Sequence, residues 1–576
     1  MVARRMNMVM VVVWVGFFAI QCSAPGEPVV MPDEPDAGPA VVEPPERPGL
    51  FSHPHGFYTE PFDLVLTSPV AGGEIRYTLN GRDPLGDQAS IYTEPLRVDT
   101  TMVIRVALVV AGQPTLESTT RTYLFAEDIP QQQEPAEYPD QWWVEHPTGP
   151  YRADYAMDDE IVSDPRYVDS FPAVFHALPV ISVAMDPGDL FGPDGIYENS
   201  EERGVEWERA ASAEFFDQAG NESFQVNCGI RVHGAGSRKP ERSPKKSLRL
   251  MFKKEYGPGK LDYPVYADSP VQRFDTLVLR ARYNRSWLHY QASQRGRAQY
   301  VRERFAADTQ RVMGHLSPRA RQVHLFLNGL YWGIYLLQER PDASFQAAHL
   351  GGLEEEYDAI NAGTATDGDR VAWEQMMQLA AAGLESTEAY EQIQTMLDID
   401  NYIDYMLLSL VLGNVDWPDR NWYAARHRSE TGKFRFFNWD AELTLRNTAD
   451  NLIDFDDPDS PGLLFQYLRV NGDFRARFAE RAVMHLTGDG ALTSAAMIER
   501  WTAIADGVDD AIVAESARWG DHYRDSRDDP EGELYTYHDH WLPERERIIE
   551  RYFPVRPGIA IEQFIAAGLY PDPAAP

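Results

Sequence analysis

Three polar side chains in the second half of the sequence have the chemistry of a metal-dependent transfer site. Asp416 and Asn421 stand five positions apart, and Asp440 ends a short aromatic run, residues 434–439. Carboxylate and amide oxygens are the hard ligands that Mg²⁺ prefers, and an aspartate can accept a proton from a substrate hydroxyl. The same spacing also arises by chance in an acidic chain, where it would mark only a turn and a strand end.

A basic segment upstream could bind the anion that such a site needs. In residues 244–250, PKKSLRL, the alternation of a strand places Lys246 with the leucines on one face and Lys245 with Arg249 on the other. A lysine in a half-buried strand is costly unless it is paired, which favours a phosphate or carboxylate partner. The preceding turn, residues 233–238, has two glycines that would let backbone amides approach a phosphate. The alternative is an exposed edge strand whose lysines block pairing.

Length and composition limit the classes of protein. The 576 residues are too many for one ordinary core, and 43% of them are hydrophobic, so we expect a folded chain of several domains. The net charge of −36 argues against nucleic-acid binding, which needs a basic face. Two cysteines exclude both a disulfide scaffold and a cysteine-based zinc site.

The N-terminus has the pattern of an export signal. Two arginines precede an apolar run, residues 8–20, and Cys22 follows at the expected cleavage point. This resembles a bacterial lipoprotein signal peptide over residues 1–22, with a plain secretory signal or an uncleaved anchor as the alternatives. Residues 23–50 are rich in proline and acidic residues and should form a tether. We therefore expect an exported membrane lipoprotein, periplasmic or at the cell surface, attached through the lipid on Cys22.

Residues 51–126 are predicted to form a small all-β sandwich. Short alternating runs such as FDLVLTS and EIRYTLNG are separated by glycine, proline and asparagine turns. GFYTEPFDLVLTSP, IRYTLNGRDP and IYTEPLRV together resemble the chitobiase/β-hexosaminidase C-terminal-type module. The resemblance implies an accessory domain that acts as a spacer, with contact to a glycan as the alternative.

The remaining chain is predicted to be α+β and then helical. After a linker, residues 127–170, whose paired tryptophans should pack onto the next domain, residues 171–460 contain strands, a hairpin across Asn328-Gly329, and helices. Residues 461–576 are mostly helical by pattern. The strand-rich part followed by the helix-rich part predicts two lobes with residues 413–445 between them. Cys228 is expected to be a buried structural thiol.

Five motifs in this part resemble those of spore-coat protein H-type (CotH) kinases. They follow in the family's order and read RVHGAGSRKPERSPKKSLRL, FDTLVLRARYNRSWLH, HLFLNGLYWGIYLLQERPDASF, GNVDWPDRNWYAAR and FRFFNWDAELTL. The resemblance implies a two-lobed, atypical protein-kinase-like domain with a helical C-terminal extension. It also implies ATP and Mg²⁺ (or Mn²⁺) as cofactors and phosphoryl transfer to Ser or Thr of a secreted or surface protein.

The resemblance also assigns roles to particular residues. Lys246, with Lys245 as the alternative, would hold the nucleotide phosphates, and Arg249 lies beside them on the same strand. Asp416 would be the aspartate of the catalytic loop that acts as the base, and Asn421 and Asp440 would be the metal ligands. Two assignments stay open, and each has a rival: Asp419 competes with Asp416 as the base, and Glu303 competes with Glu339 as the partner of the lysine.

Three functions therefore compete on the sequence. The first is a surface-anchored atypical protein kinase. The second is a non-catalytic, pseudokinase-like surface protein with an adhesive sandwich, and the third is a metal-dependent hydrolase built on the same carboxylates.

Overall fold

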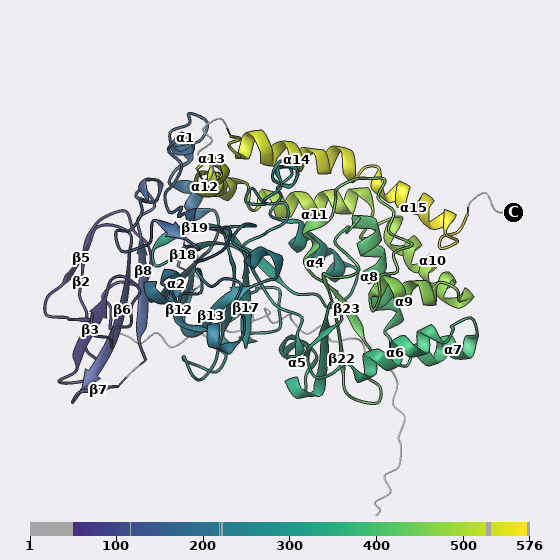
Figure 1. Cartoon of the computed structure of the whole chain (residues 1–576), viewed down its shortest axis with the longest axis horizontal. Coiled ribbons are helices and arrows are strands. Elements are labelled where there is room, and N and C mark those ends of the chain that lie inside the picture. Colours follow the sequence, from purple (N-terminus) through teal and green to yellow (C-terminus); the bar gives the residue numbers. More distant parts are fainter. Residues whose placement is uncertain (1–49, 116, 218, 221–222, 526–531, 573–576) are drawn as a thin grey trace, which may run out of the picture. The chain divides into compact units, whose positions relative to one another are not determined.

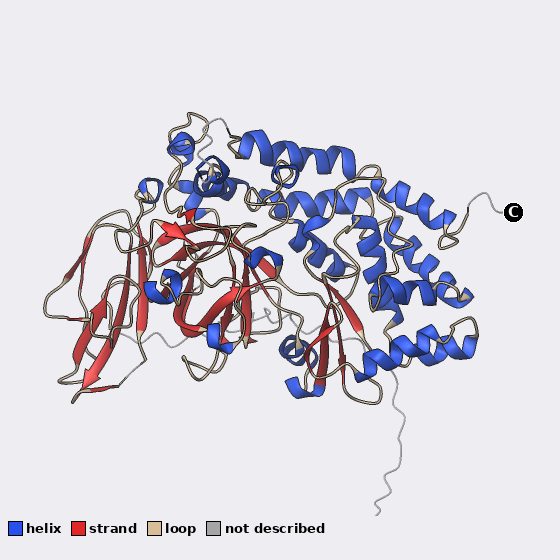
Figure 2. Ribbon diagram, viewed as in Figure 1, coloured by secondary structure: helices blue, strands red, loops and turns tan. Residues whose placement is uncertain are grey.

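The structure is a computed structural model that describes residues 50–115, 117–217, 219–220, 223–525 and 532–572. The predicted signal peptide with Cys22, and all but the last residue of the predicted tether, lie outside the described residues. As predicted, the N-terminal part is rich in strands and the C-terminal part is helical (Figures 1 and 2). Among the described helices, none combines the length and the apolar character that crossing a membrane requires.

The N-terminal β-sandwich consists of two sheets around their own apolar core. Leu64, Ile104 and Tyr123 are fully buried in that core. The larger sheet has the order β1-β8-β6-β3-β4, with β7 paired to β6, and the smaller sheet pairs β2 with β5. The strands are β1 (Gly56–Phe57), β2 (Phe62–Leu64), β3 (Glu74–Thr78), β4 (Ser90–Ile91), β5 (Leu96–Val98), β6 (Met102–Val110), β7 (Gln113–Pro114) and β8 (Thr119–Leu124).

A closed barrel of seven strands follows, in the order β11-β12-β13-β14-β17-β19-β18. Neighbouring strands are antiparallel except β11 and β18, which pair in parallel and close the barrel. The predicted hairpin turns at Asn328 and Gly329, both with positive φ, between β18 and β19. The strands are β11 (Val180–Met185), β12 (Arg209–Phe216), β13 (Ser223–His233), β14 (Ser247–Met251), β17 (Thr276–Arg280), β18 (Ala320–Leu327) and β19 (Leu330–Gln338).

Aromatic and apolar side chains fill and cover the barrel. Cys228 is buried among them, as predicted. Trp142 and Trp143 of the preceding segment are each only 1% exposed and belong to the same core, which confirms the expected packing. That segment contains β9 (Gln141–Trp142), β10 (Tyr151–Arg152) and α1 (Asp159–Val162), and α2 (Pro187–Phe191) and the pair β15 (Leu261–Asp262) and β16 (Arg273–Phe274) lie between barrel strands.

The helical part surrounds a four-stranded sheet of order β21-β20-β22-β23. Its strands are β20 (Tyr357–Asn361), β21 (Thr364–Asp367), β22 (Trp422–His427) and β23 (Arg435–Asn438). The helices before and around the sheet are α3 (Ala292–Arg295), α4 (Arg302–Val312), α5 (Ala343–Leu350), α6 (Val371–Ala381), α7 (Thr387–Ile393) and α8 (Ile399–Leu412). The tail contributes α9 (Pro461–Leu468), α10 (Gly472–Leu486), α11 (Ser494–Asp506), α12 (Asp509–Trp519), α13 (His522–Asp525), α14 (Leu542–Arg547) and α15 (Arg556–Ala566).

Helix α8 leads directly into the segment with the candidate acids. Its N-terminus is capped by the Asp398 carboxylate, which accepts a hydrogen bond from the Asn401 amide. It ends at Gly413, whose φ of +62° is the left-handed conformation typical of a helix C-terminus. All but one of its side chains are buried, so the helix is a central support for the segment that follows.

Candidate functional site

A cavity of about 290 Å³ gathers segments that are far apart in the sequence. It is lined by residues of the glycine turn after β13 (233–237), of 280–294, of 416–421 and of 440–443, and by Arg242 and Ser247. Asp416, Asn421 and Asp440 all line this cavity. The structure therefore brings Asp416, Asn421 and Asp440 together, beside the glycine turn whose backbone amides were expected to approach a phosphate.

Asp416 and Asn421 are bound to each other. Asn421 Nδ2 donates to Asp416 Oδ2 and to the Asp416 carbonyl oxygen, at 2.9 Å each. Asn421 has a φ of +65°, a left-handed conformation that asparagine tolerates better than most residues. Asp419 instead forms an ion pair with Arg420 at 2.6 Å and is not among the residues that line the cavity. Of the two rival bases, Asp416 is the one that faces the cavity.

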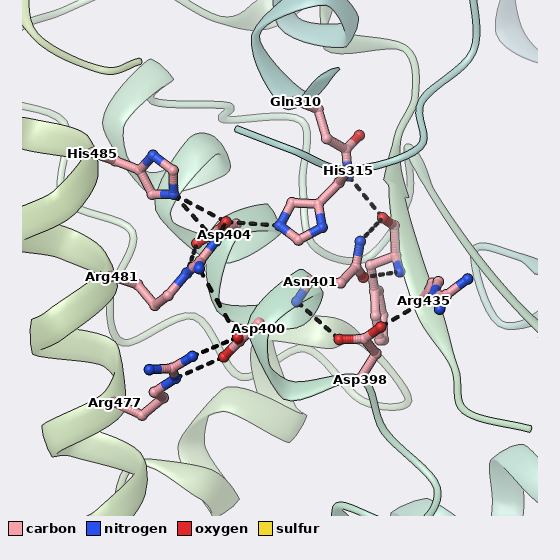
Figure 3. A network of polar contacts seen from close by, with 11 residues as sticks. Gln310, His315, Asp398, Asp400, Asn401, Asp404, Arg435, Arg477, Arg481 and His485 are labelled. Carbon is pink, nitrogen blue, oxygen red and sulfur yellow. Dashed lines mark hydrogen bonds and ion pairs between the residues drawn. The ribbon is translucent and has the colours of Figure 1, made fainter. Parts of the chain in front are cut away.

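Two helices hold the strand that carries Asp440. Gln310 of α4 donates to the Phe436 carbonyl oxygen and accepts from the Asn438 amide, so it follows the edge of β23. Asn401 of α8 accepts from the Phe436 amide at 2.6 Å (Figure 3). Because side chains of α4 and α8 both bind the backbone of β23, which leads to Asp440, these two helices fix the position of Asp440.

Asp440 belongs to a cluster of three carboxylates, of which the other two are buried. One carboxylate oxygen from each of Glu303, Asp440 and Glu442 lies within 4.8 Å of the others. Arg280, at the end of β17, forms ion pairs with all three, at 3.0 Å to Glu303, 2.6 Å to Asp440 and 3.4 Å to Glu442. Arg282 forms a second ion pair with Glu303, at 2.6 Å.

Burial and mutual repulsion perturb these groups. Burial, with the neighbouring Asp440 carboxylate, raises the pKa of Glu442 to about 8, and burial also raises the pKa of Asp440. Burial opposes the charge of Arg280, but the three carboxylates more than offset it and raise its pKa. Three carboxylate oxygens converge here, so the residues present fit a divalent cation bound at Glu303, Asp440 and Glu442.

The histidines of the cavity do not add positive charge at neutral pH. Burial, reinforced by nearby arginines, lowers the pKa of His233 well below its usual range. Burial likewise lowers the pKa of His289 to about 4. The cations that line the cavity at pH 7 are therefore Arg242, Arg280 and Arg420.

The two lysines of the basic segment lie outside the cavity. Lys245 donates to both carboxylate oxygens of Glu515 on α12, at 2.7 and 2.9 Å, and is fully buried. Lys246 donates to four backbone carbonyl oxygens of the chain that follows the glycine turn. Neither is among the residues that line the cavity. The amines of both lysines are bound to other groups of the chain, so in this structure neither lysine faces the cavity in which the nucleotide phosphates were expected.

Two further assignments differ from the structure. Glu339 was expected to pair with a lysine, but its carboxylate pairs with His349 at 2.9 Å and accepts from the Arg319 amide. Arg249 was placed near the phosphates, but it lies 3.7 Å from Asp342 and does not line the cavity. Both differences arise from pairing between side chains of separate segments, which the alternation of a strand does not predict.

Sequence reasoning missed Arg280 and Glu442. Arg280 stands at the end of the apolar strand TLVLR, and Glu442 stands two positions after Asp440. A charged side chain at the end of a buried strand is the signal that could have pointed to Arg280. Glu442 lies beyond the end of β23 at Asn438 and has no such signal. Glu303 was considered only as the partner of a lysine, whereas its partners are the two arginines.

Comparison with known families agrees with this arrangement. The model of the family described as CotH kinase protein matches residues 230–549, more than half of the chain. The chain belongs to the CotH kinase protein family, which implies the use of ATP. The chitobiase/beta-hexosaminidase C-terminal domain model matches residues 53–121, within the β-sandwich. A search of curated proteins finds no match to this chain.

Proposed function

We propose that this chain is an atypical protein kinase that transfers the γ-phosphoryl group of ATP to a Ser or Thr hydroxyl of a secreted or surface protein. The observation that carries the proposal is the convergence of Asp416, Asn421 and Asp440 on one cavity beside the glycine turn. Phosphoryl transfer asks a protein mainly for positioning and charge neutralisation, and the cavity offers both.

Each group has a role in this proposal. Asp416 accepts the proton of the substrate hydroxyl as the new O–P bond forms and the bond from the γ-phosphorus to ADP breaks. Asn421 orients the Asp416 carboxylate through its hydrogen bond. Arg280 and the backbone of residues 233–237 face the phosphates. Asp440, with Glu303 and Glu442, would hold Mg²⁺ or Mn²⁺, which would neutralise phosphate charge.

The test is transfer of labelled phosphate by the purified protein with Mg²⁺ or Mn²⁺, to itself and to a protein mixture. We expect Asp440→Asn to lower the rate by at least ~10²-fold, because it removes a carboxylate that would hold the divalent cation. Asp419→Asn is the matched control and should retain most of the rate, because Asp419 does not line the cavity. No labelling by the wild type, or equal labelling by Asp440→Asn, would contradict the proposal.

A second function, a non-catalytic surface binding protein, is favoured by one observation. The lysines that the resemblance assigns to the phosphates are bound to Glu515 and to backbone carbonyls. In that case calorimetry would show binding to a partner protein or glycan with the same affinity in the presence and absence of ATP. A nucleotide-dependent affinity would reject this second function.

Membrane attachment at the periplasmic or outer face belongs to the same proposal, and it rests on the sequence around Cys22. Growth of the producing cells with a labelled fatty acid should label the wild type and leave Cys22→Ser unlabelled. An unlabelled wild type would reject the anchor while leaving the kinase proposal intact.

A further inference from the structure

The Lys246 ammonium lies inside a cage of backbone oxygens. Its Nζ donates to the carbonyl oxygens of Ser243 at 2.7 Å, Arg238 at 2.9 Å, Lys239 at 3.2 Å and Ser237 at 3.3 Å. The residue is 1% exposed. All four oxygens belong to the same stretch of chain, residues 237–243, which loops around the amine.

The cage is completed by an aromatic face. The Lys246 Nζ lies 4.6 Å from the centre of the Trp143 ring, a cation–π contact in a desolvated setting. An ammonium without partners would be very costly at such a position, and four carbonyls with an aromatic ring offset that cost. The compact, rotatable ammonium can meet four converging oxygens, whereas the planar fork of an arginine cannot.

The caged stretch is continuous with the turn that lines the cavity. Gly234, Ala235, Gly236 and Ser237 line the cavity, and the Ser237 carbonyl oxygen is one of the four that Lys246 binds. Strand β13 holds the start of the turn through His233, which pairs with Ser247. Gly234 has a φ of +109°, so the turn bends through a conformation that few other residues adopt. The glycines are thus held between one end fixed by the barrel and another fixed by Lys246.

Two further polar contacts support the same stretch. Ser200 Oγ donates to the Arg238 carbonyl oxygen at 2.7 Å, and the Arg238 guanidinium donates to the Gly234 carbonyl oxygen at 2.8 Å. Neither Ser200 nor Arg238 lines the cavity. The side chain that makes most bonds to this backbone is Lys246.

We propose that Lys246 is a positioning residue that holds residues 234–243 in the conformation that shapes the phosphate end of the cavity, without touching the nucleotide. The inference rests on the proposed kinase function for its consequence in catalysis. The contacts between Lys246 and the backbone of residues 237–243, which we call the clasp, do not depend on activity. Loss of the clasp should loosen the turn, weaken ATP binding and leave the carboxylate cluster in place.

The first experiment measures hydrogen exchange of the backbone amides of residues 234–243 in Lys246→Met. We expect these amides to exchange at least ~10-fold faster than in the wild type, because the four carbonyl oxygens lose their common hydrogen-bond donor. Lys245→Met is the matched control, because Lys245 is equally buried but binds Glu515. It should lower the melting temperature without selective exchange in the turn. Unchanged exchange of the turn in a folded Lys246→Met would overturn the proposal.

The second experiment separates positioning from direct phosphate binding. Lys246→Arg keeps the positive charge, so it would restore much of the activity if the side chain bound phosphate. Under the proposal it does not rescue, and both Lys246→Met and Lys246→Arg raise the KM for ATP by about tenfold or more with a smaller change in kcat. If Lys246→Arg restored the activity while the amides of residues 234–243 exchanged as slowly as in the wild type, the proposal would be overturned.

A milder variant covers the case in which Lys246→Met does not fold. Ser200→Ala removes one hydrogen bond to the Arg238 carbonyl oxygen and leaves the lysine in place. We expect a several-fold faster exchange confined to residues 234–243, and an unaltered turn in Ser200→Ala would count against the clasp. If the wild type transferred no phosphate at all, the proposed function would fail while the exchange measurements would still decide the clasp.

Discussion

At the scale of single residues, the site is defined by the convergence of three carboxylates. Glu442 is buried, and its carboxylate accepts from the amides of Tyr283 and Asn284. Burial and the neighbouring Asp440 carboxylate nevertheless raise the pKa of Glu442 to about 8. A cation that binds to the cluster should therefore displace this proton.

The first prediction concerns pH and metal. The pKa of Glu442 is raised from its ordinary 4.5 to about 8, so between these values the folded chain holds a proton that the unfolded chain does not. Its contribution to stability is thus greatest below about pH 4.5 and falls as pH rises toward 8. Binding of Mg²⁺ at pH 7 should release up to about one proton, and the affinity should rise by at most ~10-fold per pH unit up to pH 8.

Titration of the protein with Mg²⁺ in a weakly buffered solution measures the released proton. Glu442→Gln should bind without that release and with a flatter pH dependence. If Glu442→Gln released as many protons as the wild type, Glu442 would not belong to the metal cluster.

At the scale of elements, the support of the site lies in the contacts among α4, α8 and α10. Asp404 of α8 is completely buried and accepts from His315 at 2.7 Å, just beyond α4, and from His485 and Arg481 of α10 (Figure 3). Burial opposes the charge of Asp404, but these donors hold its pKa well below the usual range. The carboxylate therefore ties together the two helices that grip β23 and the tail.

The second prediction is that Asp404→Asn lowers the free energy of unfolding by about 3–5 kcal/mol at pH 7, because it leaves the buried part of Arg481 without its counter-charge. Since the folded pKa is depressed, the contribution of Asp404 is present above about pH 4 and is lost as the pH falls below that value. Urea unfolding at pH 7 and at pH 3 measures both effects.

Asp400→Asn, on the same helix, is the control. Its side chain is 39% exposed and pairs with Arg477 (Figure 3), so the cost should stay below about 1 kcal/mol. Equal costs for the two variants would mean that the buried network does not support the helices in the way described.

At the scale of the whole described chain, the β-sandwich is attached to the barrel by buried polar contacts. Glu214 of β12 accepts from Thr122 Oγ1 of β8 at 2.5 Å and lies 2.6 Å from His55 Nδ1. Thr122 also shares a hydrogen bond of 2.7 Å with Ser182 of β11. This face of the sandwich is therefore buried against the barrel.

The third prediction is that the sandwich and the barrel unfold in the same thermal transition. Glu214→Ala should shift that transition downward as a whole, because Glu214 is fully buried at the junction. Asp63→Ala should leave it in place, since the ion pair of Asp63 with Arg97 is exposed. Scanning calorimetry that resolved two peaks, with only the smaller one moved by Glu214→Ala, would show that the sandwich is an independent module.

The sequence by itself determined the local structure and the candidate acids. The hairpin at Asn328-Gly329 was predicted because strand alternation and turn residues act over a few positions. Asp416, Asn421 and Asp440 stood out because their spacing has a chemical meaning.

Only the tertiary structure decided which charges meet. Arg280 and Asp440 are 160 positions apart, and Lys245 and Glu515 are 270 apart. Strand alternation states which face a lysine occupies, but it contains nothing about what packs on that face. The packing of β17 against α4 and the segment after β23 brings Arg280 to the carboxylates. Docking of the helical tail gives Lys245 its partner Glu515. Pairing at such separations depends on the whole fold, because a buried charge is stable only where another element supplies its partner.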